Sequence, residues 1–114
     1  MALSIATREL DGVTILDLSG RITLGEGSVQ LRDAVRELIS KGVKNILIGL
    51  GEVNYIDSSG LGELVSSYTT AKNQQANVKL LNLTKKVKDI LQLTKLYTVF
   101  DIYEDEASAI ASFK

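Results

Sequence analysis

The chain has 114 residues, of which 45% are hydrophobic and 24% are charged, a length and composition suited to one compact domain over residues 1–114. Its 13 basic and 14 acidic side chains leave a formal net charge of −1, which gives no electrostatic basis for binding nucleic acid non-specifically. The sequence contains no cysteine and no histidine, which excludes disulfides, thiolate or imidazole metal sites, and Ser-His or Cys-His nucleophile pairs.

Composition also sets expectations about the surroundings of the protein. No window of the sequence approaches the length of a membrane span, and the N-terminus has no basic segment ahead of an apolar core. We therefore expect a cytoplasmic protein that binds neither membrane nor nucleic acid and that carries no metal or other cofactor. We also expect a monomer or a weak dimer.

The first part of the chain predicts a β-hairpin followed by a helix. Apolar side chains alternate on both sides of the turn sequence Asp11-Gly12, which indicates strands of about residues 3–9 and 13–19. A glycine-containing loop runs from Thr23 to Gly27, and we expect it to be flexible. Apolar residues at helical spacing then predict a helix of about residues 28–40, with Ser28 as its cap.

The middle of the chain changes from an unbroken apolar run to an amphipathic segment. Residues 46–50 contain no polar side chain and predict a strand of about residues 44–50 that is covered on both faces, as in a parallel sheet between helices. We expect a loop through Asn54 and then a helix from Ser58 to about Asn73. Asp57 and Ser58 are both good N-cap residues, and the sequence leaves open which of them is the cap. Either way, a small hydroxyl group lies at a helix N-terminus, where anions are favoured.

The last part of the chain predicts two more strands and two more helices. We expect a strand of about residues 78–83, a short helix capped by Thr84, a strand of about residues 99–103, and a final helix whose start carries the three acids of residues 104–106. The expected apolar side of that final helix consists of Ala107, Ile110, Ala111 and Phe113.

This order of elements predicts an α/β fold with a mixed, mostly parallel sheet, an N-terminal hairpin and about four flanking helices. Binding sites in such sheets gather outside the carboxyl ends of the parallel strands. We therefore expect Ser58, Thr84 and the loop of residues 23–28 to lie along one edge.

The stretch Asn54-Tyr55-Ile56-Asp57-Ser58-Ser59-Gly60-Leu61-Gly62 resembles the signature of the STAS-domain anti-sigma factor antagonists. Residues 13–22 are similar to the second strand of that family with its closing glycine. The apolar strand before the motif, and the strand Leu80-Leu81-Asn82-Leu83 with the short helix after Thr84, also resemble the family in order and spacing. The similarity covers essentially the whole chain.

The resemblance implies a binding module controlled by phosphorylation. In that family the serine directly after the aspartate is phosphorylated, which implies Ser58 as the acceptor, with Ser59 as the second choice. It also implies that the unmodified domain binds an anti-sigma factor that is itself an ATP-using serine kinase, that the phosphorylated domain is released, and that a separate serine phosphatase resets the switch. The residues expected to bind the partner are Thr23, Asp57, Ser59, Gly60, Leu61, Gly62, Lys85 and Lys86.

Two positions in this set are unusual. Thr23 stands where most such antagonists carry an aspartate, which puts any contact that depends on that carboxylate in doubt. Lys85 and Lys86 fall in the first turn of a predicted helix, where the helix dipole disfavours a cation. Our hypothesis is that they form an anion-attracting rim beside Ser58, and the alternative is that they are an ordinary solvated helix face.

Other functions are weakly supported by the sequence. A hydrolase or phosphatase that uses Ser58 or Asp57 as nucleophile would have no histidine base and no Gly-x-Ser-x-Gly motif. Phosphorylation of Asp57, as in receiver domains, would need a carboxylate cluster that holds magnesium, and the sequence offers none near the ends of the first strands. Nucleotide binding by the loop Gly25-Glu26-Gly27-Ser28 is also disfavoured, because no Gly-Lys-Ser/Thr follows it. We therefore expect that this protein is not an enzyme. A constitutive scaffold without a switch remains open, and Thr23 is the feature that favours it.

Overall fold

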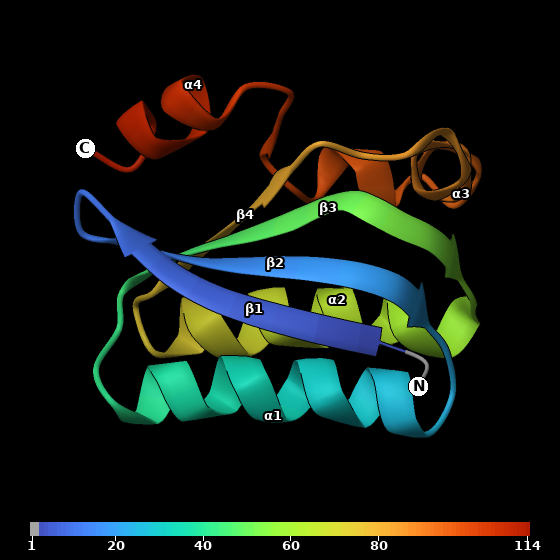
Figure 1. Ribbon diagram of the computed structural model, residues 1–114, viewed down its shortest axis with the longest axis horizontal. Helices are drawn as coiled ribbons and strands as arrows, with labels where there is room; N and C mark the ends of the chain where they lie inside the picture. Colours follow the sequence, from blue (N-terminus) through green and yellow to red (C-terminus); the bar gives the residue numbers. More distant parts are fainter. Residues whose placement is uncertain (1–2) are drawn as a thin grey trace.

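A computed structural model describes residues 3–114 and shows, within that range, a five-stranded sheet with four helices (Figure 1). The strands are β1 (Leu3–Leu10), β2 (Val13–Ile22), β3 (Asn45–Ile56), β4 (Asn77–Leu81) and β5 (Ile102–Tyr103). The helices are α1 (Glu26–Ser40), α2 (Ser58–Asn73), α3 (Lys85–Leu93) and α4 (Glu106–Ala111), and a short 3-10 turn, η1 (Leu96–Thr98), follows α3.

The strands are arranged in the sheet in the order β1-β2-β3-β4-β5. β1 is antiparallel to β2, and every other neighbouring pair is parallel. Helices α1 and α2 cover one face and α4 lies over the other, while α3 lies at one end of the sheet, where its Val87 and Leu91 join the core beneath α1 and α2 (Figure 1). The predicted α/β fold, with an N-terminal hairpin on a mostly parallel sheet, is therefore confirmed.

The hairpin turn has the predicted sequence and a conformation that explains it. Leu10 pairs with Val13, so only Asp11 and Gly12 connect the strands, and both have positive φ angles, 53° and 80°. Asp-Gly is a preferred pair for such a turn because aspartate tolerates the left-handed region and glycine adopts it freely.

β3 is longer than predicted, and the expected loop through Asn54 is wrong. The strand continues to its last residue because it pairs with β2 as far as Arg21↔Tyr55 and Ile22↔Ile56, after two shifts in register. The shifts leave Val53 and Ile56 as the buried residues of this extension. Apolar residues spaced by three do not show the alternation of a regular strand, which is why the pattern predicted a loop.

The start of α1 also differs from the prediction. The helix begins at Glu26, its N-cap is Gly25, and no side chain caps it. Ser28 lies inside the first turn, where its hydroxyl donates a hydrogen bond to the Thr23 carbonyl at 2.9 Å. The predicted cap at Ser28 is therefore wrong, although that side chain does fasten the loop to the helix.

The C-terminal elements are shorter than predicted. β4 ends at Leu81, and Asn82 turns the chain away with a left-handed φ of 56°. The strand expected over residues 99–103 is limited to Ile102–Tyr103, and Phe100 is buried by an edge-on contact with Tyr68 instead of by pairing.

The predicted apolar side of α4 is only partly correct. Ile110 is buried as expected, but its buried neighbour is Ala109, whereas Ala107 and Ala111 are exposed. The helix is only six residues long, and Asp105 caps it by accepting the Ser108 N–H.

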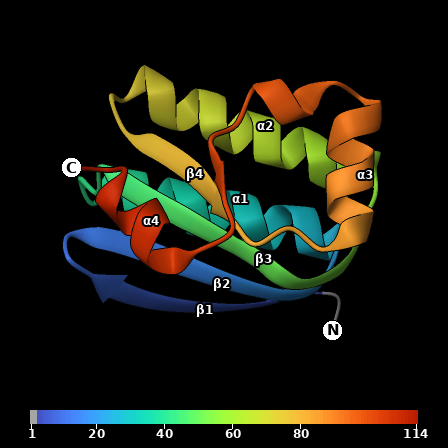
Figure 2. The same cartoon turned by 90° about the horizontal axis from the view of Figure 1, so that it is seen from above.

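The sheet has a core on each face. The larger core lies between the sheet and helices α1 and α2, and the smaller one joins Val13, Ile15, Leu47 and Leu81 to Ala109 and Ile110 of α4. Both views place α3 at the end of the sheet where β3 ends and α2 begins (Figures 1 and 2). No helix within residues 3–114 is long and apolar enough to cross a membrane.

Candidate functional site

Asp57 is the residue that joins the end of β3 to the start of α2, and both of its carboxylate oxygens are engaged. Oδ1 accepts the Gly60 N–H at 2.8 Å, the bond of a helix N-cap, and Oδ2 accepts the Leu24 N–H at 3.0 Å. These bonds, the one from Gly60 first, lower the pKa of Asp57 because they favour the ionised form. One carboxylate therefore caps α2 and holds the β2–α1 loop against it.

Ser58 is the first residue of α2 and is exposed. The sequence left open whether Asp57 or Ser58 caps α2, and the structure shows that Asp57 does. The Ser58 hydroxyl has no hydrogen-bond partner among residues 3–114. Ser59 is half-buried. Of the two serines, Ser58 is the more accessible to another protein.

Gly60 is a glycine because another part of the backbone lies against it. A Cβ atom at this position would lie 2.1 Å from the Ile22 carbonyl oxygen, well inside any tolerable contact. The same carbonyl accepts the Asp57 N–H at 3.2 Å, so the end of β2 fits directly against the start of α2. Gly62 is different, since a Cβ atom there would meet nothing within 4 Å.

The other predicted contact residues on this edge occupy different environments. Leu61 is only 6% exposed and packs into the core, so its side chain supports α2 from inside. The Thr23 carbonyl accepts hydrogen bonds from the Ser28 N–H at 3.0 Å and the Ser28 hydroxyl at 2.9 Å. Leu24 beside it, which sequence reasoning missed, is 78% exposed. An apolar residue next to a loop glycine is the signal that could have found it.

The two lysines of the predicted basic rim have different surroundings, and Arg21, which was not predicted, lies beside one of them. Lys85 makes an ion pair with Asp89 at 2.8 Å, which raises its pKa and offsets its charge. Lys86 instead lies over the Tyr55 ring at 5.7 Å, and Arg21 lies over the same ring at 5.2 Å. Neither Lys86 nor Arg21 forms an ion pair within the described part of the chain. We call Arg21, Tyr55 and Lys86 the cation–aromatic cluster.

The cation–aromatic cluster could not be found from sequence because it depends on the extension of β3. Only the late register pair Arg21↔Tyr55 places these two side chains together. Lys86 reaches them from the first turn of α3, whose cap Thr84 accepts the Val87 N–H and donates its hydroxyl to the Val53 carbonyl at 2.8 Å. The predicted meeting of Ser58, Thr84 and the loop of residues 23–28 at one edge is thus observed.

The site can present a hydroxyl group but has little with which to activate it. The chain has no histidine, and both oxygens of the neighbouring Asp57 already accept backbone hydrogen bonds. Within residues 3–114 no three acidic side chains come together in a way that could hold a metal ion.

Comparison with known proteins gives a consistent result. The family model described as STAS domain matches residues 4–109. The anti-sigma-B factor antagonist of Bacillus subtilis is 28% identical over 102 residues, which cover 90% of this chain and 92% of that protein. Among solved structures, a Thermotoga maritima protein assigned as an anti-sigma factor antagonist is 26% identical with a TM-score of 0.87, covering 95% of this chain and 92% of that one. The Bacillus cell fate determinant SpoIIAA in its phosphorylated form shares the fold, with a TM-score of 0.75 at 18% identity and coverage of 97% and 100%.

Proposed function

This chain belongs to the STAS domain family, and we propose that it is an anti-sigma factor antagonist whose binding is controlled by phosphorylation of Ser58. In the unmodified state it binds an anti-sigma factor with serine kinase activity in the cytoplasm and so regulates transcription that depends on a sigma factor. Phosphate on Ser58 releases it, and a serine phosphatase restores it. The observation that carries the proposal is the exposed Ser58 hydroxyl at a helix start that Asp57 already caps.

The relatives support both the proposed binding of an anti-sigma factor and its proposed control by phosphorylation. Proteins similar to this chain over nearly its whole length are named as antagonists of the anti-sigma-B and anti-sigma F factors. SpoIIAA, which has the same fold, has been solved both with and without its phosphate. The fold can therefore carry the modification without being lost.

The local geometry supplies a physical reason for release. A phosphate on Ser58 adds about −1.5 to −2 charges at neutral pH, directly beside the ionised Asp57. Asp57 already accepts hydrogen bonds from the Gly60 and Leu24 N–H groups. The phosphate must therefore either compete with Asp57 for these donors or point into the interface with the partner. In an interface it brings like-charge repulsion and a desolvation cost. Release then follows from the lost contacts, and the core of the domain is unaffected.

The surface around Ser58 defines the chemistry of the partner. Leu24 on the β2–α1 loop is 78% exposed and Val29 near the start of α1 is 39% exposed, which together give an apolar contact surface. The cation–aromatic cluster adds two positive charges without carboxylate partners in residues 3–114. Both features fit a partner surface that combines an apolar recess with acidic side chains. Thr23 adds no charge, so the basic character of this edge comes from Arg21 and Lys86.

Isothermal titration calorimetry with an anti-sigma factor encoded beside this chain tests the proposal. The unmodified chain should bind, and Ser58→Asp should bind more weakly. Lys86→Glu should also weaken binding, whereas Lys85→Glu is the matched control because that lysine is already paired with Asp89. A chain that binds no such partner would contradict the proposal. Binding that persists undiminished when Ser58 is phosphorylated would favour a constitutive scaffold instead.

A further inference from the structure

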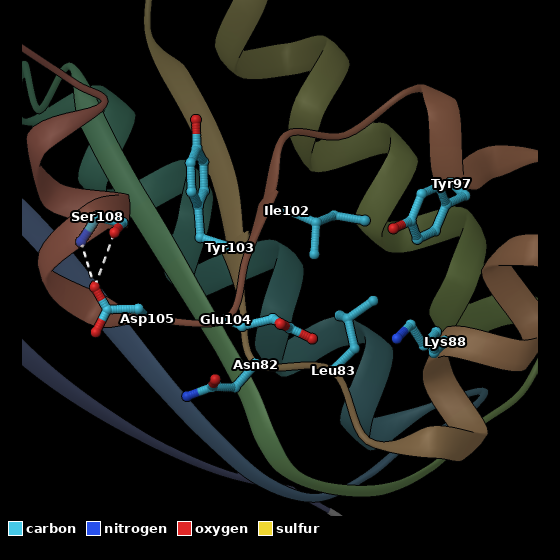
Figure 3. Close-up of a pocket in the computed structure, with 9 residues that line it drawn as sticks. All are labelled: Asn82, Leu83, Lys88, Tyr97, Ile102, Tyr103, Glu104, Asp105 and Ser108. Carbon is cyan, nitrogen blue, oxygen red and sulfur yellow. Dashed lines mark hydrogen bonds between the residues drawn. The ribbon is translucent and has the colours of Figure 1, made fainter.

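A cavity of about 500 Å³ opens at the same edge of the sheet but apart from Ser58, just beyond the carboxyl ends of β4 and β5 (Figure 3). Its lining includes Leu83, which follows β4, Ile102, which begins β5, and Lys88 from α3. Ligands of parallel sheets bind outside the carboxyl ends of the strands, and small-molecule sites measure roughly 300–1,000 Å³. Both the place and the size therefore suit a small ligand.

Two opposite charges face each other across this cavity without meeting. Figure 3 shows the Lys88 amine and the Glu104 carboxylate reaching toward Leu83 from opposite sides. They do not form an ion pair with each other, and neither has a charged or hydrogen-bonded partner in the described part of the chain. Lys88 is half-buried and Glu104 is exposed.

The neighbouring acid on the cavity wall is a useful contrast. The Asp105 carboxylate accepts the Ser108 N–H at 2.8 Å and the Ser108 hydroxyl at 2.9 Å, bonds that cap α4 (Figure 3). Both bonds go to its Oδ2 oxygen, which is thereby committed to the fold. Glu104 has no such commitment among residues 3–114, so its carboxylate is available to a ligand.

The space between the two charges is partly apolar. Leu83 lies between the Lys88 amine and the Glu104 carboxylate, and Ile102 extends toward the Tyr97 hydroxyl (Figure 3). A ligand that fits this arrangement has an anionic group for the lysine, a cationic group for the glutamate and a small apolar side chain that rests against Leu83 and Ile102.

We propose that this cavity binds a small zwitterion of the α-amino acid type. Its carboxylate binds the Lys88 ammonium group, its amine binds the Glu104 carboxylate, and its side chain rests on Leu83 and Ile102. The inference does not depend on the proposed switch at Ser58, because it uses none of the residues around that serine.

Nuclear magnetic resonance titration of the ¹⁵N-labelled full chain with the common amino acids tests this inference. At least one amino acid should shift the amide signals of Leu83, Lys88, Ile102 and Glu104. Analogues of that ligand lacking either the amine or the carboxylate should bind more weakly by about tenfold or more, because each loses one charge-assisted contact. Lys88→Gln and Glu104→Gln should each cause a similar loss.

Matched controls are available on the other face of the sheet. Lys41 and Glu37 form an exposed ion pair at the C-terminal end of α1, so Lys41→Gln and Glu37→Gln make the same charge changes far from the cavity and should leave the affinity unchanged. The double variant with Lys88→Glu and Glu104→Lys should recover binding that Lys88→Glu alone abolishes, and thermal unfolding of each variant checks the fold. The inference is overturned if no amino acid shifts these signals at millimolar concentration, if Lys88→Gln and Glu104→Gln bind as well as the unchanged chain, or if the analogue without the amine binds equally well.

Discussion

At the scale of single residues, Asp57 matters because one carboxylate serves two backbone segments. Asparagine is as good an N-cap as aspartate, but it has only one oxygen that can accept a hydrogen bond. Asp57→Asn should therefore keep the Gly60 bond and lose the Leu24 bond, at a cost of about 1–2 kcal/mol in the free energy of unfolding. Hydrogen exchange should show a less protected Leu24 amide and a still protected Gly60 amide. Unchanged protection of both would contradict the double role.

The same carboxylate predicts a specific pH dependence. The pKa of Asp57 is lowered in the folded chain from its ordinary value of 3.8, so its contribution to stability is fully present above that value and is lost as the pH falls through the folded pKa. Urea denaturation of the unchanged chain and of Asp57→Asn should give a stability difference that shrinks only as the pH falls below 3.8. Comparing the two proteins cancels the titration of the other acids. A difference that does not depend on pH would show that the charge of Asp57 is not involved.

Gly60 and Gly62 form a natural pair for testing the contact between β2 and α2. Gly60→Ala places a Cβ atom 2.1 Å from the Ile22 carbonyl oxygen, a clash with backbone that should cost at least about 1–3 kcal/mol. Gly62→Ala meets nothing within 4 Å and lies in a helix, so it should stabilise the protein by about 0.5–1 kcal/mol. Thermal unfolding distinguishes the two, and equal effects would contradict the close approach at Gly60.

At the scale of elements, β3 contributes neighbouring side chains to the cores on both faces of the sheet. Leu47 faces the smaller core under α4, while Ile48 faces the larger core under α1 and α2, and both are fully buried. Leu47→Ala and Ile48→Ala should each lower the free energy of unfolding by about 2–5 kcal/mol. Only Leu47→Ala should also expose the amides of α4 to hydrogen exchange. A loss below about 0.5 kcal/mol, the range of surface changes, would place that residue outside the core.

Most elements could be predicted from the sequence because their apolar patterns are regular. The exceptions have physical reasons. The end of β3 was missed because register shifts against β2 space its buried residues, Val53 and Ile56, by three. β5 was predicted too long because Phe100 is buried by a ring contact with Tyr68, which the sequence pattern cannot distinguish from burial within a strand.

At the scale of the whole molecule, the position of Ser58 at the carboxyl edge could be predicted, but its surroundings could not. Sites in parallel sheets gather at the carboxyl edge, and this rule correctly predicted that Ser58, Thr84 and the loop of residues 23–28 lie along one edge. The contact of Leu24 with Asp57 spans 33 residues, and no local pattern reports it. The cavity beside Lys88 likewise forms only when α3, η1 and the C-terminal segment are packed together.

The central claim is that Ser58 is the phosphate acceptor that controls release from the partner. The most direct test maps phosphate by mass spectrometry after incubation with an anti-sigma factor kinase and ATP, while size-exclusion chromatography follows the complex. Ser58→Ala should fold normally, because Asp57 supplies the cap, and Ser59→Ala is the matched control. We predict that the unchanged chain and Ser59→Ala gain one phosphate at residue 58 and leave the complex, while Ser58→Ala gains none and stays bound. Phosphate at another residue, or release of Ser58→Ala on addition of ATP, would contradict the claim.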